Sequence, residues 1–136
     1  MAKLNPYLTF NGNCREAMNF YKDCLGGELT FTVVGESPAA NQVPPQMKND
    51  ILHAALNTGE LEIMATDMRP ESLNEGNAVH LCLIFKTEAE LRSMWDKLSA
   101  GGTIKQPVME MFFGLIGTFT DKFGKSWILE NNKPAA

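Results

Sequence analysis

The sequence predicts an α+β protein made of two tandem β-α-β-β-β modules, and two observations support this prediction. The order of strand and helix patterns in residues 6–34 recurs in residues 80–108. Each repeat is followed by two more strand patterns joined by a turn. So regular a match indicates an internal duplication. We expect the two modules to form a curled mixed sheet around a cavity.

The first repeat begins with a short strand pattern over residues 7–10, which the turn residues 11–13 follow. Asn13 precedes Glu16 by three positions, which approximates a capping box at the start of a helix. Gly26 and Gly27 end the helix, and residues 28–34 are a strand pattern rich in Thr, Val and Phe. The apolar residues at helical spacing are Ala17, Phe20, Tyr21 and Cys24.

The second repeat follows the same order, from a strand at Leu81 to Phe85. Thr87 and Glu90 form a T-x-x-E capping box, which predicts where the second helix begins. A second Gly-Gly pair closes that helix, and residues 103–108 are extended again. The apolar face consists of Leu91, Met94, Trp95 and Leu98, of which the first three match the spacing of Ala17, Phe20 and Tyr21.

A hairpin pattern completes each module. In the first, a turn over residues 57–60 would pair Ala55 with Glu62, so alternation would place His53 and Glu62 on the same sheet face. In the second, residues 114–131 turn at Asp121-Lys122-Phe123-Gly124. We expect a single domain over residues 1–136, with modules of about 1–68 and 78–132 and a linker of about 69–77.

One segment, Glu36 to Asp50, lacks periodicity and carries three of the seven prolines. It predicts a loop or mobile flap that closes over a ligand.

Composition excludes several functional classes. The net charge of −4 argues against sequence-independent nucleic-acid binding, which needs a basic surface. Apolar runs fall short of the roughly 20 residues of a membrane span. The three cysteines have no CxxC spacing, so neither a disulfide framework nor a zinc knuckle is expected. These features predict a cytoplasmic protein with no membrane partner.

Four stretches of the sequence form a recognisable combination. They are NPYLTFNGNCREAMNFYKDCLGGEL, LEIMATD, GGTIKQPVMEMFFG and DKFGKSWILEN. Together they resemble the vicinal oxygen chelate superfamily, which includes glyoxalases, extradiol dioxygenases and bleomycin resistance proteins, and more narrowly its PhnB-like branch. The resemblance implies a glyoxalase-like fold, a homodimer and a small-molecule ligand in a cavity between the modules. The methyltransferase label of the branch finds no G-x-G turn to support it, so that activity is not expected.

The resemblance also implies a divalent metal bound by residues of both modules. His80 and Glu62 match two ligand positions. Pro6 and Ile128 occupy the other two and have no side-chain donor, so the usual site is incomplete. His53 or Glu130, placed by alternation alone, are the candidates that would complete it.

Two functions follow from these residues. One is a glyoxalase-like lyase, isomerase or dioxygenase in which Glu62 and His80 bind metal or act as acid and base. The other is a non-catalytic protein that binds or sequesters its ligand. In either case we expect His53, Met64, Phe112 and Phe113 to contact the ligand. Alternatively, His80 is a hydrogen-bonded histidine that starts a buried strand.

Overall fold

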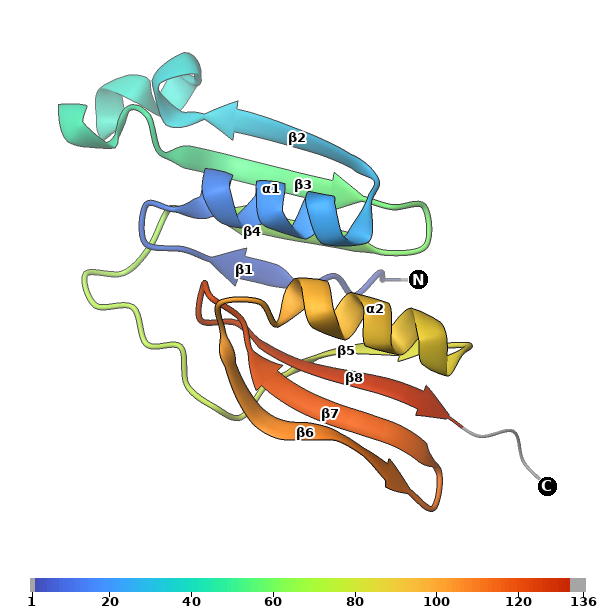
Figure 1. Ribbon diagram of the computed structural model, residues 1–136. Coiled ribbons are helices and arrows are strands. Elements are labelled where there is room, and N and C mark those ends of the chain that lie inside the picture. Colours follow the sequence, from blue (N-terminus) through green and yellow to red (C-terminus); the bar gives the residue numbers. More distant parts are fainter. Residues whose placement is uncertain (1, 133–136) are drawn as a thin grey trace. The chain divides into compact units, whose positions relative to one another are not determined.

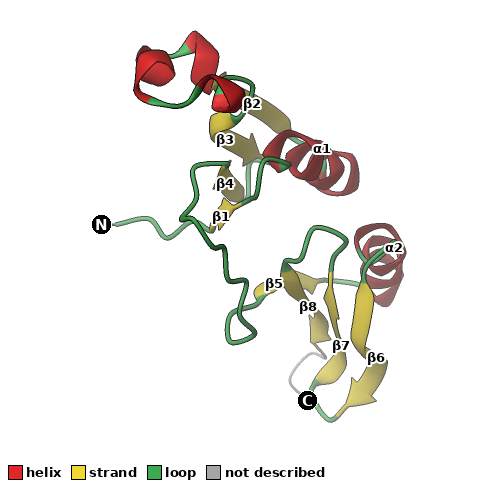
Figure 2. Ribbon diagram, turned by 90° about the vertical axis from the view of Figure 1, so that its left-hand side faces the viewer, coloured by secondary structure: helices red, strands yellow, loops and turns green. Residues whose placement is uncertain are grey.

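The computed structural model describes residues 2–132 and contains two compact units, Met1–Asn74 and Glu75–Ala136. Each unit is a β-α-β-β-β module with one four-stranded mixed sheet (Figure 1). In each unit a single α-helix lies along one face of the sheet (Figure 2). The duplicated modules and the fold class predicted from the sequence are therefore confirmed.

Unit 1 has the strand order β1-β4-β3-β2, in which β1 runs parallel to β4 and the other pairs are antiparallel. Its elements are β1 (Tyr7–Thr9), α1 (Cys14–Leu25), β2 (Glu28–Val33), β3 (Ile51–Asn57) and β4 (Glu62–Thr66). Alternate residues of β3 and β4 face α1, among them Ala54, Leu56 and Ile63, and all three are buried. The opposite face of this sheet is polar at several positions.

The start of α1 corrects the predicted capping box. Asn13 makes no side-chain hydrogen bond to the helix. Instead Asp67, which follows β4, is buried and its Oδ1 accepts hydrogen bonds of 3.0 Å from the backbone N–H groups of Gly12 and Cys14. Its Oδ2 accepts another, of 2.8 Å, from the N–H of Ile51. A long-range carboxylate thus satisfies the donors that the predicted cap leaves open.

The β3–β4 turn lies one residue later than predicted. The N–H of Thr58 bonds to the carbonyl of Leu61 at 3.0 Å, because Asn57 remains in the strand and its side chain accepts from Gly59. Glu62 therefore pairs with Asn57, and Ala55 pairs with Met64. The predicted Ala55–Glu62 pairing is wrong by two positions. This even shift leaves His53 and Glu62 on the same face, as predicted, but farther apart.

The proline-rich segment contains more helix than expected. Short 3-10 helices occupy Val34–Glu36, Pro38–Gln42 and Pro45–Met47. Backbone hydrogen bonds from Val34 to Asp50 and from Gly35 to Lys48 join the two ends of the segment. Closure over a ligand stays a prediction.

Unit 2 has the strand order β5-β8-β7-β6, with β5 parallel to β8. Its elements are β5 (Leu81–Phe85), α2 (Glu88–Leu98), β6 (Thr103–Met111), β7 (Gly114–Thr120) and β8 (Ser126–Asn132). Thr87 is the N-cap of α2, and its hydroxyl accepts from the N–H of Glu90 at 3.1 Å. The β5 bounds and the second cap are confirmed, whereas β6 extends three residues beyond its predicted end.

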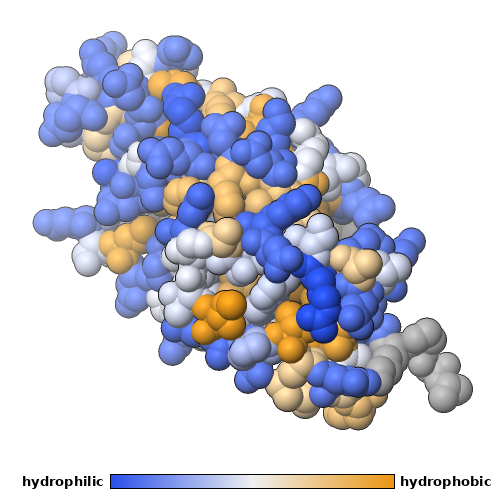
Figure 3. Space-filling view, in the orientation of Figure 1, coloured by the Kyte–Doolittle hydropathy of each residue, from blue (hydrophilic) through white to orange (hydrophobic). Residues whose placement is uncertain are grey.

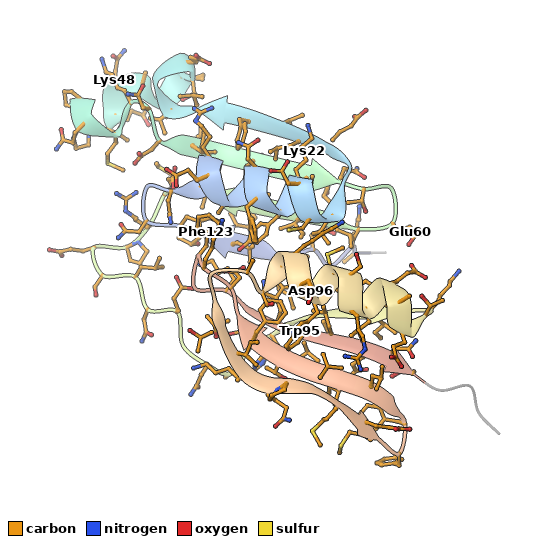
Figure 4. The ribbon with its side chains drawn as sticks, viewed as in Figure 1. Lys22, Lys48, Glu60, Trp95, Asp96 and Phe123 are labelled. Atoms are coloured by element: carbon orange, nitrogen blue, oxygen red, sulfur yellow. The ribbon has the colours of Figure 1, made fainter. Side chains whose placement is uncertain are left out.

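A tryptophan fills the space between α2 and its sheet. Trp95 points from the helix toward the strands (Figure 4) and meets Phe119 edge to face, with ring centroids 5.0 Å apart. Gly117 lies beneath this ring, and a Cβ placed there would come within 2.5 Å of it. Trp127 is also buried, and its Nε1 donates to Asp121 at 2.8 Å. Both tryptophans therefore belong to the core, as the helical spacing predicted for Trp95.

Within residues 2–132, no helix is long and apolar enough to cross a membrane.

Candidate functional site

The sheet of unit 2 has one covered face and one open face. Phe119, Trp127 and Leu129 point toward α2 and are buried. By alternation, Thr118 and Ile128, which pair with one another, lie on the open face. Cys82 pairs with Ile128 from the other side, so β5, β8 and β7 contribute one row of side chains to this face.

A cavity of about 510 Å³ lies on unit 2 at one end of these strands. Its lining residues come from the segment before β5, from β6, β7 and β8, and from the β7–β8 turn. They are Glu75, Gly76, Asn77, His80, Lys105, Thr118, Phe119, Thr120, Gly124 and Ser126. The volume falls within the range of small-molecule sites, roughly 300–1,000 Å³.

His80 is positioned by the parallel pairing of β5 with β8. Because Leu81 pairs with Trp127, His80 lies at the level of Ser126, where β8 begins. Ser126 pairs in turn with Thr120, and Thr120 pairs with Thr103. His80 is exposed, and its side chain makes no hydrogen bond or ion pair to any described residue. It is therefore an exposed imidazole at a cavity, and not a buried strand histidine.

Glu75, a lining residue of the cavity, forms an ion pair with Lys125. Nζ of Lys125 lies 2.8 and 3.0 Å from the two carboxylate oxygens of Glu75. Lys125 is buried, and its backbone N–H donates to Asp121, which also accepts from the N–H of Phe123. Asp121 thus organises the β7–β8 turn, as the sequence predicted for a turn residue.

Several lining residues were missed by the sequence analysis, namely Glu75, Lys105, Thr118, Thr120 and Ser126. The alternation in Gly117-Thr118-Phe119-Thr120 is a signal that could have placed both threonines on the face opposite Phe119. Lys105 and Glu75 follow no such pattern. The position of Lys105 depends on an irregularity in β6, and that of Glu75 depends on its ion pair with Lys125, 50 positions later.

Glu62 and His53 belong to unit 1. Glu62 accepts a hydrogen bond of 3.0 Å from the Asn5 amide, and Nζ of Lys3 lies 3.9 Å from the same oxygen. Nδ1 of His53 lies 3.3 Å from the Tyr7 hydroxyl. In the observed register Glu62 pairs with Asn57, and His53 lies four residues from Asn57 along β3, which is a distance of about 13 Å. Unit 1 therefore brings these two residues onto one face but not into one site.

The other expected contact residues lie on strands and turns outside the lining of this cavity. Phe112 and Phe113 form the turn between β6 and β7, with ring centroids 5.2 Å apart, and Phe112 is 92% exposed. Met64 is half-buried in β4. Figure 3 shows hydrophobic side chains at the surface in the part of the view that holds unit 2. Ligand contact by these three residues stays a prediction.

The metal implied by the resemblance does not fit the donor sets of the separate units. In unit 2, Ile128 pairs with Cys82 and has no side-chain donor for a metal. Glu130 pairs with Ile84, which lies four residues along β5 from His80, so Glu130 and His80 are about 13 Å apart along the strands. In unit 1, Pro6 contributes only a backbone carbonyl, which accepts from Met64. Within residues 2–132, no group of three or more His, Cys, Asp or Glu side chains is placed to hold a metal ion.

Cys82 is a thiol on the open face. Partial burial, and then the nearby Glu130 carboxylate, raise the pKa of Cys82, because both disfavour the thiolate. The thiol is therefore mostly protonated near neutral pH, which suits a lining group better than a nucleophile.

Comparison with known proteins places the chain in a family. The pattern of the Glyoxalase/Bleomycin resistance protein/Dioxygenase superfamily matches residues 3–129. The chain is 32% identical to protein YjdN of Escherichia coli strain K12, over 93% of this chain and 92% of that protein.

Solved structures agree with this result. Protein PA1353 from Pseudomonas aeruginosa is 33% identical with a TM-score of 0.87, covering 98% of this chain and all of that one (100%). A PhnB protein from Bacillus cereus is 25% identical with a TM-score of 0.75, covering 96% and 99%. The duplicated modules, the matching pattern and these relatives lead to one conclusion: the chain belongs to the glyoxalase/bleomycin resistance protein/dioxygenase superfamily.

Proposed function

We propose that this protein binds a small oxygen-rich molecule on the open face of the unit 2 sheet. The observation that carries the proposal is the cavity at His80, where an imidazole and three hydroxyl groups line a space of about 510 Å³. Such groups donate and accept hydrogen bonds to carbonyl, hydroxyl and acid oxygens. A cavity with a few convergent polar groups is the usual form of a ligand site.

Beyond these polar groups the open face carries apolar side chains on either side of one carboxylate, that of Glu130. Two residues along β7 from Thr118, the next side chain on this face is Ile116, which pairs with Glu130 of β8 and Met109 of β6. Ile84 pairs with Glu130 from the other side and is 63% exposed. A ligand with an oxygen-bearing end and a small apolar end would match this change along the strands.

Sequestration without chemistry is the form of this function that the donor set favours. Ile128 stands where the resemblance implies a carboxylate ligand, and isoleucine can neither bind a metal nor move a proton. The superfamily includes resistance proteins, and in the non-catalytic form we propose the ligand is held while no bond changes.

Catalysis is the second candidate, because the His80 side chain lines the cavity without a partner among the described residues. An imidazole can remove a proton next to a carbonyl and return it to the neighbouring atom. Glu62, from unit 1, is the other acid-base group that the sequence suggested. Replacing each by glutamine tests the two roles separately.

We also propose a cytoplasmic homodimer. The dimer is supported by the sheet edges at β2 and β6, which can pair with another chain. The cytoplasmic location is supported by the cysteines Cys14, Cys24 and Cys82, which form no disulfide bond. Light scattering during gel filtration measures the mass directly, and a monomer mass at micromolar concentration would contradict the dimer.

Thermal-shift screening tests the binding function. The panel contains hydroxy acids, 1,2-dicarbonyls, catechols and phosphonates, applied to the wild type, His80→Gln and His53→Gln. We expect at least one class to raise the melting temperature of the wild type and of His53→Gln, with a clearly smaller rise for His80→Gln. Equal stabilisation of all three proteins would place the ligand elsewhere. A stabilising compound that the wild type also converts, and His80→Gln does not, would establish catalysis.

A further inference from the structure

We propose that the unit 2 cavity binds an oxyanion, such as a carboxylate or phosphate group of a small molecule, with Lys105 as its charge partner. This inference rests on the proposed ligand site and specifies the chemical class of its ligand. Three features support it: the strand irregularity that presents Lys105, the balance of charge around the cavity, and the hydroxyl groups across from Lys105.

Lys105 lies at a β-bulge in β6. Ile104 pairs with Phe119 and Gln106 pairs with Thr118, so Lys105 is an extra residue between two consecutive partners. Two residues of β6 therefore oppose the single residue Thr118, and a bulge of this kind redirects a side chain and is common beside functional sites. The side chain of Lys105 lines the cavity.

The neighbour of Lys105 does not compete for this position. The amide nitrogen of Gln106 lies 3.3 Å from the carbonyl of Pro107 and 2.9 Å from the sulfur of Met109, so this side chain turns along its own strand. The side chain of Lys105 makes no hydrogen bond or ion pair to any described residue. Its ammonium group is available to a ligand.

Lys105 is the lining residue whose positive charge has no acidic partner among the described residues. The carboxylate of Glu75 is paired with Lys125 at 2.8 Å, so the two charges balance. Lys105 adds a positive charge, and the lining contains no other acidic side chain. Lys105 would attract an anion bound here, and the one carboxylate of the lining, Glu75, is already neutralised by Lys125.

Hydroxyl groups complete the site. Thr118, Thr120 and Ser126 line the cavity on β7 and β8, with Thr120 and Ser126 paired directly across the two strands. Their side chains make no hydrogen bond to any described residue. An ammonium ion with several hydroxyl donors matches the several acceptor oxygens of an acid group better than it matches a neutral ligand.

Nuclear magnetic resonance titration at low salt tests this inference through the backbone amides of Thr118, Thr120 and Ser126. The probes are inorganic phosphate, lactate and the neutral lactamide, which matches lactate in size. We expect phosphate, lactate or both to shift these amides, with lactamide at least about tenfold weaker than lactate, because the neutral amide cannot form a hydrogen bond between two charged groups with Lys105. Whether phosphate or lactate binds more tightly identifies the acid group.

Two variants with the same change of charge separate the site from the general surface. Lys105→Gln should weaken anion binding about tenfold, and Lys105→Arg should restore most of it. Lys97→Gln, on α2 and outside the lining, should stay within about twofold of the wild type. Thr118→Val removes one hydroxyl at nearly constant shape and should weaken binding severalfold.

The outcomes distinguish this inference from the proposed function. If lactamide or another neutral compound shifts the same amides and Lys105→Gln binds it unchanged, the oxyanion inference fails while the ligand site stands. Equal weakening by Lys97→Gln and Lys105→Gln would also overturn the inference, since the effect would then be one of net charge. If neither charged nor neutral compounds shift these amides, both the inference and the proposed site fail.

Discussion

The carboxylate of Asp67 accepts a hydrogen bond of 3.0 Å from the backbone N–H of Cys14, so the residue after β4 stabilises the first turn of α1. The same side chain bonds to the N–H groups of Gly12 and Ile51. One buried carboxylate therefore joins the helix start to the β3 start.

Replacing Asp67 by asparagine should destabilise the protein by about 1–3 kcal/mol. The amide keeps one oxygen but presents an NH₂ group where Oδ2 accepted from Ile51, which leaves buried donors facing one another. Urea unfolding of Asp67→Asn measures the change, with Asn13→Ala as the matched control at the cap that the sequence suggested. Equal stability of the two variants would contradict this assignment.

The two helix starts should respond differently to loss of the capping side chain. Thr87→Ala removes the acceptor for the N–H of Glu90 and should cost about 1 kcal/mol. Asn13→Ala should cost clearly less, because Asn13 makes no side-chain bond to α1. Unfolding free energies from the same urea series test this, and a larger loss at Asn13 would disprove the difference.

Gly117→Ala should destabilise unit 2 by about 1–3 kcal/mol, because the new Cβ would meet two ring atoms of Trp95 at 2.5 and 2.8 Å. The smaller ring in Trp95→Phe should relieve this contact. A double-mutant cycle measures the coupling, and the alanine should cost less in the Trp95→Phe background. Additive losses would show that the two residues do not meet.

The thiol of Cys82 should react faster with iodoacetamide after Glu130→Gln. The carboxylate raises the pKa of Cys82 and so lowers the thiolate fraction at any given pH. Its removal lowers that pKa, which shifts the alkylation profile of the Cys82 peptide toward lower pH. Glu88→Gln, on α2, is the control. An unchanged profile for Glu130→Gln would contradict the electrostatic cause, while burial would still raise the pKa.

Local patterns predicted most of the fold. Helical spacing at Leu91 and Trp95 and the cap at Thr87 placed α2, because these signals lie within a few residues of one another. The Asp67 cap was not predictable in this way, since Asp67 lies more than 50 positions after Cys14, the residue whose N–H it accepts from. The β3–β4 register was missed because Asn57 fits both a strand end and a turn.

The candidate site was predicted only in part. His80 was identified by its place before an apolar strand, and the cavity includes it. Lys105 was not identified, because a bulge at this residue breaks the alternation on which a strand prediction depends. The hydroxyls of Thr118 and Ser126 occur on different strands, and only the pairing of β7 with β8 brings them to one face.

The most direct test of the proposed ligand site uses the two histidines of the chain, His53 in unit 1 and His80 in unit 2. Their imidazole Hε1 resonances are assigned with His53→Gln and His80→Gln and followed while a stabilising compound from the thermal-shift panel is added at constant pH. We expect a saturable shift of the His80 resonance, with little change at His53. Saturable shifts confined to His53, or stabilisation without any shift at His80, would contradict it.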